Sequence, residues 1–182
     1  MPQADKLHLM TLDESLAASE LNYSRLLGWN DRLDNKIHLV LSIATAMLGG
    51  AGLLIENSLA YMDSVLFWLA AALMLCPIAG VMFQIASATS PRLGPPPVAL
   101  KHQPQASLIF FATTASLDRE DFHKQLQNRS KESYMADLSS QQHANSEILT
   151  VKFGHLSNAY RWLWASFVAF CPAALCLIRM KY

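Results

Sequence analysis

The chain has 182 residues, of which 52% are hydrophobic and 15% are charged, and its formal net charge is zero. A soluble domain of this length carries about a quarter charged residues, so the composition argues against a soluble globular protein. A zero net charge also provides no overall attraction to the phosphates of DNA or RNA, and we expect neither as a partner. The charged residues are concentrated in some regions and nearly absent from others.

Three nearly uncharged windows predict three transmembrane helices. The windows 37–55 and 66–87 match the roughly 20 residues that a helix needs to cross a bilayer. The third window, 162–178, is shorter, but it is flanked by residues expected at a membrane interface: Trp162, Trp164, Arg179 and Lys181. Several acidic residues precede the first window, unlike the short basic start of a signal peptide. The lipid bilayer is therefore an expected partner.

The basic residues predict the orientation of these spans. Residues 1–36 contain four Lys or Arg, residues 56–65 contain none, and residues 88–161 contain eight. The positive-inside rule then places the N-terminus and 88–161 in the cytoplasm and the 56–65 loop outside. The side of the short C-terminal tail stays open. The expected organisation is a cytoplasmic helix, a transmembrane hairpin, a cytoplasmic sensing region, and a third span with its tail: 1–36, 37–87, 88–161 and 162–182.

The N-terminal part predicts one helix that continues into the first span. Thr11 and Glu14 have the spacing of a capping box, so the helix begins near residue 12. Small residues follow at intervals of four inside the span, at Ser42, Ala46 and Gly50, and such a face lets helix backbones approach closely. The partner of this face is either the second span or another subunit.

The remaining elements are also predicted to be helical. Pro77 in the second span removes one backbone hydrogen bond, and we expect a kink there. The proline-rich segment 91–97 is an extended linker. Ser116 is the predicted N-cap of a helix over 117–127, and a single long helix is predicted over 132–180. The expected fold is an all-α integral membrane protein.

The sequence shows no catalytic or metal-binding pattern. No histidine pair has ligand spacing, and there is no Gly-rich phosphate loop, nucleophile elbow or Cys–His pairing. We therefore expect no enzyme activity, no catalytic residue, no metal site and no cofactor. The three spans contain no Asp, Glu, Lys or Arg, which argues against ion-coupled transport.

Several residues outside the spans are candidates for binding an anion. A basic run interleaved with acidic residues is either a solvated helix face or a phosphate site: Arg119, Lys124, Arg129 and Lys131. Arg92 lies in a proline-bracketed turn after the second span, where it could bind a lipid headgroup, cap the helix or contact a ligand phosphate. Phe110 and Phe111 are either core residues or a surface on which a base stacks.

A series of short motifs resembles one known family. The motifs are Asp34-Asn35-Lys36 before the first span, Pro91-Arg92-Leu93 after the second, Leu108-Ile109-Phe110-Phe111, Ser116 to Phe122, and Tyr134 to Tyr160 with Asp137-Leu138, Gln141, Ile148 and Lys152. Their order and spacing over about 25–175 resemble the Pycsar transmembrane effectors of bacterial antiphage defence. Ile37 and Phe122 depart from the family, which usually has a small residue and a tyrosine there.

The resemblance implies a function in two steps. A partner cyclase makes a cyclic pyrimidine mononucleotide, cyclic CMP or cyclic UMP, as a regulatory ligand. The effector binds it in its cytoplasmic region and then oligomerises or rearranges, impairing the bacterial inner membrane and aborting the infection. One negative charge and one base need only one or two basic residues and an aromatic surface. The expected contacts are Arg92, Phe110, Arg119, Tyr134 and Lys152, and the expected assembly residues are Ser42, Ala46, Gly50 and Pro77.

Three other functions are compatible with the same sequence. The first is a defence effector gated by a cyclic di- or oligonucleotide, because the charge count suits either ligand. The second is a structural membrane anchor or scaffold whose cytoplasmic helices bind a protein partner. The third is a constitutive toxin that needs no ligand.

Overall fold

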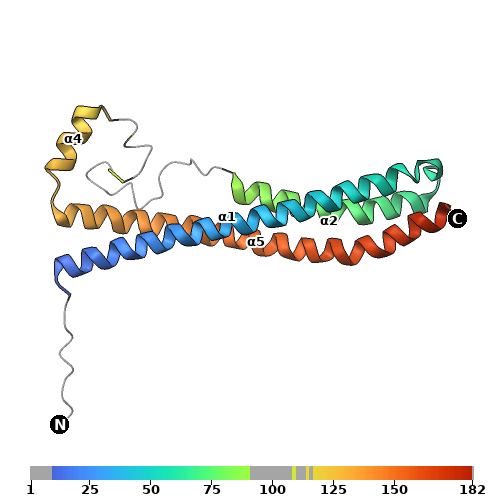
Figure 1. Ribbon diagram of the computed structural model, residues 1–182, viewed down its shortest axis with the longest axis horizontal. Helices are drawn as coiled ribbons and strands as arrows, with labels where there is room; N and C mark the ends of the chain where they lie inside the picture. The colour runs from blue at the N-terminus through green and yellow to red at the C-terminus, as the bar shows by residue number, and fades with distance from the viewer. Residues whose placement is uncertain (1–9, 91–107, 110–113, 115–116, 182) are drawn as a thin grey trace, which may run out of the picture. The chain divides into compact units, whose positions relative to one another are not determined.

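The structure, a computed structural model, describes residues 10–90, 108–109, 114 and 117–181. These residues form four α-helices and one short 3-10 helix, and the described part of the chain contains no strand (Figure 1). The helices are α1 (Leu12–Glu56), η1 (Leu59–Tyr61), α2 (Val65–Thr89), α4 (Arg119–Gln127) and α5 (Lys131–Lys181). The protein is an all-α membrane protein, as predicted.

Three helices, α1, α2 and α5, are long and apolar enough to cross a membrane. In their most apolar windows only 22%, 33% and 22% of the residues are buried within the protein. Many of the other apolar side chains face outward, as expected for helices that contact lipid. Lipid tails are as apolar as a protein core, so such side chains are stable there. The three spans predicted from the sequence are confirmed as helices of this kind.

The start of α1 is the predicted capping box. The Glu14 N–H donates to Thr11 Oγ1 at 3.3 Å, and the Thr11 N–H donates to Glu14 Oε2 at 2.8 Å. These reciprocal bonds satisfy donors that the first helical turn leaves without an intrahelical partner. From here α1 continues for 45 residues without interruption, which confirms the prediction of one helix that includes the first span.

The second span begins where Ser64 accepts a hydrogen bond from the Leu66 N–H at 3.3 Å. It continues through Pro77 and ends at Thr89. The start of α4 differs from the sequence expectation. Asp118 precedes its first residue in an extended conformation, so the helix begins two residues later than predicted, and Leu117 is not helical.

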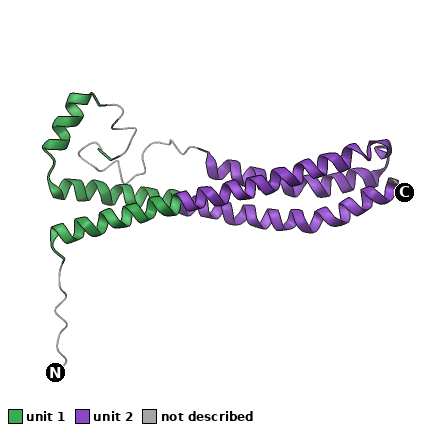
Figure 2. Cartoon of the chain, in the orientation of Figure 1, with its two compact units in different colours: residues 1–30, 93–148 green, residues 31–92, 149–182 purple. Residues whose placement is uncertain are grey.

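The described chain divides into two compact units (Figure 2). Unit 1 comprises residues 1–30 and 93–148, and unit 2 comprises residues 31–92 and 149–182. Helices α1 and α5 therefore contribute residues to both units, whereas α2 belongs to unit 2 and α4 to unit 1. The four segments expected from the sequence were defined by the side of the membrane on which each lies, and that assignment stays a prediction.

In unit 2 the three long helices pack around an apolar core. Two clusters of buried residues draw members from α1, α2 and α5, with Val40, Val81 and Ala159 fully buried in one of them. Gly80 allows the closest approach, because a Cβ placed there would lie 2.6 Å from the ring of Trp162. The absence of a side chain at Gly80 therefore lets α5 place an indole ring directly against the backbone of α2.

In unit 1 the first part of α1 lies beside the first part of α5, and the two run in the same direction (Figure 1). Lys131 at the start of α5 pairs with Asp13 at 2.7 Å, and the Gln142 side chain donates to the Ser19 carbonyl oxygen. These polar contacts join the two helices here. This arrangement positions the junction between α4 and α5.

Candidate functional site

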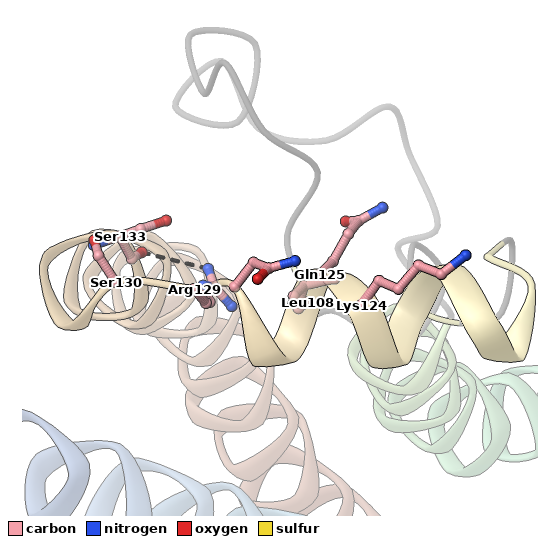
Figure 3. Close-up of a pocket in the computed structure, with 7 residues that line it drawn as sticks. Leu108, Lys124, Gln125, Arg129, Ser130 and Ser133 are labelled. Atoms are coloured by element: carbon pink, nitrogen blue, oxygen red, sulfur yellow. Dashed lines mark hydrogen bonds between the residues drawn. The ribbon is translucent and has the colours of Figure 1, made fainter.

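A pocket of about 580 Å³ lies in unit 1, where α4 ends and α5 begins (Figure 3). This volume is within the range of small-molecule sites. The side chains of Lys124 and Gln125 project from α4, and that of Arg129 follows in the connection to α5. The described residues that line it are Leu108, Lys124, Gln125, Asn128, Arg129, Ser130 and Ser133.

Local capping shapes this pocket. Asn128 is the C-cap of α4, and its N–H donates to the Lys124 carbonyl oxygen at 3.1 Å. Two residues later Ser130 accepts the Ser133 N–H through its hydroxyl oxygen at 3.2 Å, as an N-cap serine of α5 does. The short connection places the positive end of the α5 dipole beside two basic side chains. The arrangement favours an anionic ligand.

Arg129 is the most constrained cation of the pocket. Its Nη2 atom donates to Asp137 Oδ2 at 2.6 Å and to the Ser133 carbonyl oxygen at 3.3 Å. The guanidinium carbon lies 5.6 Å from the centre of the Tyr134 ring, within the range of a cation–π contact. Only 10% of the Arg129 side chain and 4% of the Asp137 side chain are exposed. The pair is therefore a buried ion pair, and its orientation is fixed.

Asp137 connects two parts of the chain behind the pocket. In addition to Arg129, the Leu108 N–H donates to Asp137 Oδ2 at 3.1 Å across 29 residues of sequence. Both bonds end on the same carboxylate oxygen. The other oxygen, Oδ1, is buried and accepts no hydrogen bond from the described residues.

Tyr134 is held between the two helices of unit 1. Burial raises the pKa of its phenol, and the neighbouring carboxylate of Glu20, which accepts its hydrogen bond, raises it further. The hydroxyl therefore stays protonated at neutral pH and donates to Glu20. Its ring supports the guanidinium of Arg129, so Tyr134 contributes to the pocket through Arg129.

The ligand contacts expected from the sequence that the structure describes belong to both units. Arg119 is the exposed first residue of α4 and Tyr134 lies beside Arg129, and both belong to unit 1. Lys152 lies in unit 2, where it pairs with Asp34 at 3.0 Å. Arg92 and Phe110 lie outside the described residues. Arg119, Tyr134 and Lys152 are not among the described residues that line the pocket.

Of the residues that line the pocket, the sequence marks only Lys124 and Arg129, as members of a basic run that is either a phosphate site or a solvated helix face. Neither residue is among the expected nucleotide contacts. Asp137 is eight residues from Arg129, across the start of a helix, so helical periodicity does not relate them. The only available signal was the combination of basic run, helix end and following N-cap serine.

The expected assembly residues all belong to unit 2. Ser42 and Ala46 are exposed on α1, whereas Gly50 is half-buried and a Cβ there would lie 3.6 Å from the Phe170 ring. Pro77 is half-buried within α2. One further polar contact joins the helices of this unit, between Gln84 Oε1 and His155 Nδ1 at 2.9 Å.

The family model described as Pycsar effector protein domain matches residues 18–179. No curated protein and no solved structure matches the chain. Over the described residues, no group of three or more His, Cys, Asp or Glu side chains is placed to hold a metal ion.

Proposed function

The chain belongs to the Pycsar effector family, whose members are effectors of bacterial antiphage defence, and from this premise we propose that a cyclic pyrimidine mononucleotide activates it. The ligand is cyclic CMP or cyclic UMP, made by a partner cyclase during infection. The observation that carries the proposal is the pocket at the α4–α5 junction, which combines a suitable volume with Lys124 and Arg129.

The pocket has the chemistry that such a ligand needs. A cyclic mononucleotide carries one negative charge, which Lys124 and Arg129 can neutralise with charge-assisted hydrogen bonds. The amide groups of Gln125 and Asn128 can each donate to and accept from the edge of a pyrimidine base. No bond of the ligand needs to break, so the protein acts as a receptor without enzymatic activity or a cofactor.

The spans supply the output. We place the protein in the bacterial inner membrane, with the N-terminus and residues 88–161 in the cytoplasm and the 56–65 loop outside, as the basic residues indicate. A ligand that binds one arrangement of the helices more tightly shifts the population towards that arrangement. The exposed small residues Ser42 and Ala46 support homo-oligomerisation, and membrane impairment follows from it.

Purified protein in liposomes tests this proposal. Cyclic CMP or cyclic UMP should bind and cause dye release, and Lys124→Gln should weaken binding about 10-fold, because a hydrogen bond to a charged group is lost. Lys131→Gln is the matched control, since Lys131 is also an exposed lysine of the same region but pairs with Asp13 outside the pocket.

Other outcomes point to other functions. Release with a cyclic dinucleotide, and with neither mononucleotide, would change the identity of the signal. Release without any nucleotide would indicate a constitutive toxin, and no release under any condition would favour a membrane scaffold. The variant Arg92→Ala distinguishes a ligand contact from a lipid-binding or helix-capping role. Loss of nucleotide binding with normal membrane insertion indicates a ligand contact, and unchanged binding indicates one of the other roles.

A further inference from the structure

We propose that Arg129 and Asp137 together recognise ribose 3′,5′-cyclic phosphates. Arg129 binds the phosphate, and Asp137 Oδ1 accepts a hydrogen bond from the neighbouring 2′-hydroxyl. This inference rests on the proposed function and names the part of the nucleotide that the site distinguishes. It concerns the sugar and not the base.

The starting observation is the unsatisfied oxygen of Asp137. Its side chain is 4% exposed, yet Oδ1 accepts no hydrogen bond from any residue that the structure describes. Buried carboxylate oxygens are normally paired, and leaving one without a donor is costly. Oδ2, by contrast, accepts from both Arg129 and Leu108. The uneven distribution leaves one acceptor position open for a donor that enters from outside.

Asp137 is bonded to the wall of the pocket, although it is not itself a lining residue. Its two hydrogen-bond partners, Arg129 and Leu108, both line the pocket, and Ser133, one helical turn before it, does so as well. The carboxylate therefore lies directly behind the wall. Two hydrogen bonds hold Leu108 in place, one from its N–H to Asp137 at 3.1 Å and one from the Thr114 hydroxyl to its carbonyl oxygen at 3.2 Å. A ligand that displaces Leu108 reaches the carboxylate.

Arg129 has further N–H groups that can donate hydrogen bonds to a phosphate. Both of its bonds to described residues are made by Nη2, so Nη1 and Nε are available to a ligand while the ion pair with Asp137 stays intact. A guanidinium presents five N–H donors in a planar fork, and the two that are used leave three. The pair can thus offer three donors and one acceptor to the same ligand.

Chemistry then selects the group that Asp137 binds. Because the guanidinium and the carboxylate are in direct contact, the two ligand groups that they bind must also be close neighbours. In a 3′,5′-cyclic ribonucleotide the 2′-hydroxyl is on the carbon next to the one that carries the 3′-oxygen of the phosphate ring. The N–H donors of a pyrimidine lie on the far edge of the base. The 2′-hydroxyl is therefore the donor that fits.

The decisive experiment compares a nucleotide with its 2′-deoxy analogue. Binding of 3′,5′-cyclic UMP and 3′,5′-cyclic CMP to the full-length protein in detergent is measured against their 2′-deoxy counterparts. The ribose form that binds should do so at least about 10-fold more tightly, as expected for a hydrogen bond to a charged acceptor. Equal binding of the two forms overturns the inference and leaves the proposed function standing. Failure of all four nucleotides to bind overturns the proposed function itself.

A variant assigns the preference to Asp137. In Asp137→Asn the preference for ribose should fall to near one, because an amide N–H₂ group takes the place of the open acceptor. Asp13→Asn is the matched control, since Asp13 also pairs with a basic residue of unit 1 but lies outside the pocket, and it should keep the full preference. A preference unchanged in Asp137→Asn overturns the inference. If this variant does not fold, the ratio measured on the unaltered protein decides.

Discussion

At the scale of single residues, Lys152 has two competing roles, as a ligand contact or as part of a structural ion pair. The resemblance to the family suggests a ligand contact, whereas the structure places its ammonium group 3.0 Å from a carboxylate oxygen of Asp34 in unit 2. The first role needs a positive charge at position 152 itself. The second needs only that positions 34 and 152 carry opposite charges.

A charge exchange distinguishes these roles. Lys152→Asp alone should abolish nucleotide-dependent dye release, because it creates two facing carboxylates between α1 and α5. We expect the double variant Asp34→Lys with Lys152→Asp to restore most of the release, since the ion pair is rebuilt in reverse. Nucleotide affinity measured on the same three proteins is the control. A double variant that inserts normally but binds no nucleotide would make Lys152 a ligand contact.

At the scale of elements, the start of α1 should depend on pH. The backbone N–H of Thr11 and then its hydroxyl donate to Glu14, and these bonds lower the pKa of that carboxyl below its usual 4.5. A carboxyl whose pKa is lowered by folding contributes stability above the unfolded pKa, and this contribution is lost as the pH falls through the folded value.

We therefore expect the first turn of α1 to fray as the pH falls below the usual glutamate pKa of 4.5. Amide hydrogen exchange at residues 12–15 measures this fraying between pH 3 and pH 7, after correction for intrinsic exchange rates. Glu14→Gln is the control, because it keeps an acceptor but cannot ionise. The same pH dependence in both proteins would show that the capping box is not its cause.

The contact of Gly80 in α2 with Trp162 in α5 leads to a prediction about helix packing. Alanine at position 80 would place its Cβ 2.6 Å from the Trp162 ring, so the helices must separate or the indole must move. Overpacking of this kind costs about 1–3 kcal/mol. Gly80→Ala should lower the thermal midpoint of unfolding in detergent.

Gly52→Ala is the matched control for this change. It is also a glycine within a membrane-spanning helix, but a Cβ there meets nothing within 4 Å. Alanine has the higher helix propensity, so this variant should be neutral or slightly stabilising. A destabilisation of similar size in both variants would mean that helix packing at Trp162 is not responsible.

The elements of this fold could largely be predicted from the sequence, because their signals are local. A hydrophobic window predicts a membrane span, and Thr11 with Glu14 predicts a helix start, independently of the rest of the sequence. The start of α4 was misplaced, since Ser116 and Asp118 are both good capping residues and the choice depends on context. The pocket depends on contacts such as Leu108 with Asp137, 29 residues apart, which no local pattern encodes.

At the scale of the whole molecule, lateral assembly is the property most open to test. Ser42 and Ala46 are exposed within the single chain, so a larger side chain at position 46 extends from the outer surface of α1. Ala46→Phe should leave the fold and nucleotide binding unchanged but reduce oligomer formation and dye release, because close backbone approach is prevented.

Val168→Phe provides the control for added bulk. Val168 is 74% exposed on the third span, and phenylalanine there should be accommodated by lipid. Cross-linking in membranes with and without nucleotide measures assembly for both variants. Normal assembly of Ala46→Phe would exclude this face of α1 as the contact between subunits.

The indole of Trp162 against Gly80 also has a consequence for observing activation. The chain contains four tryptophans, and the ring of this one lies against the backbone of a second span. In a protein that keeps Trp162 and replaces the other three, fluorescence would report on a single helix–helix contact in the membrane. A red shift or increased quenching by lipid-soluble probes on adding nucleotide would show that α2 and α5 separate when the signal arrives.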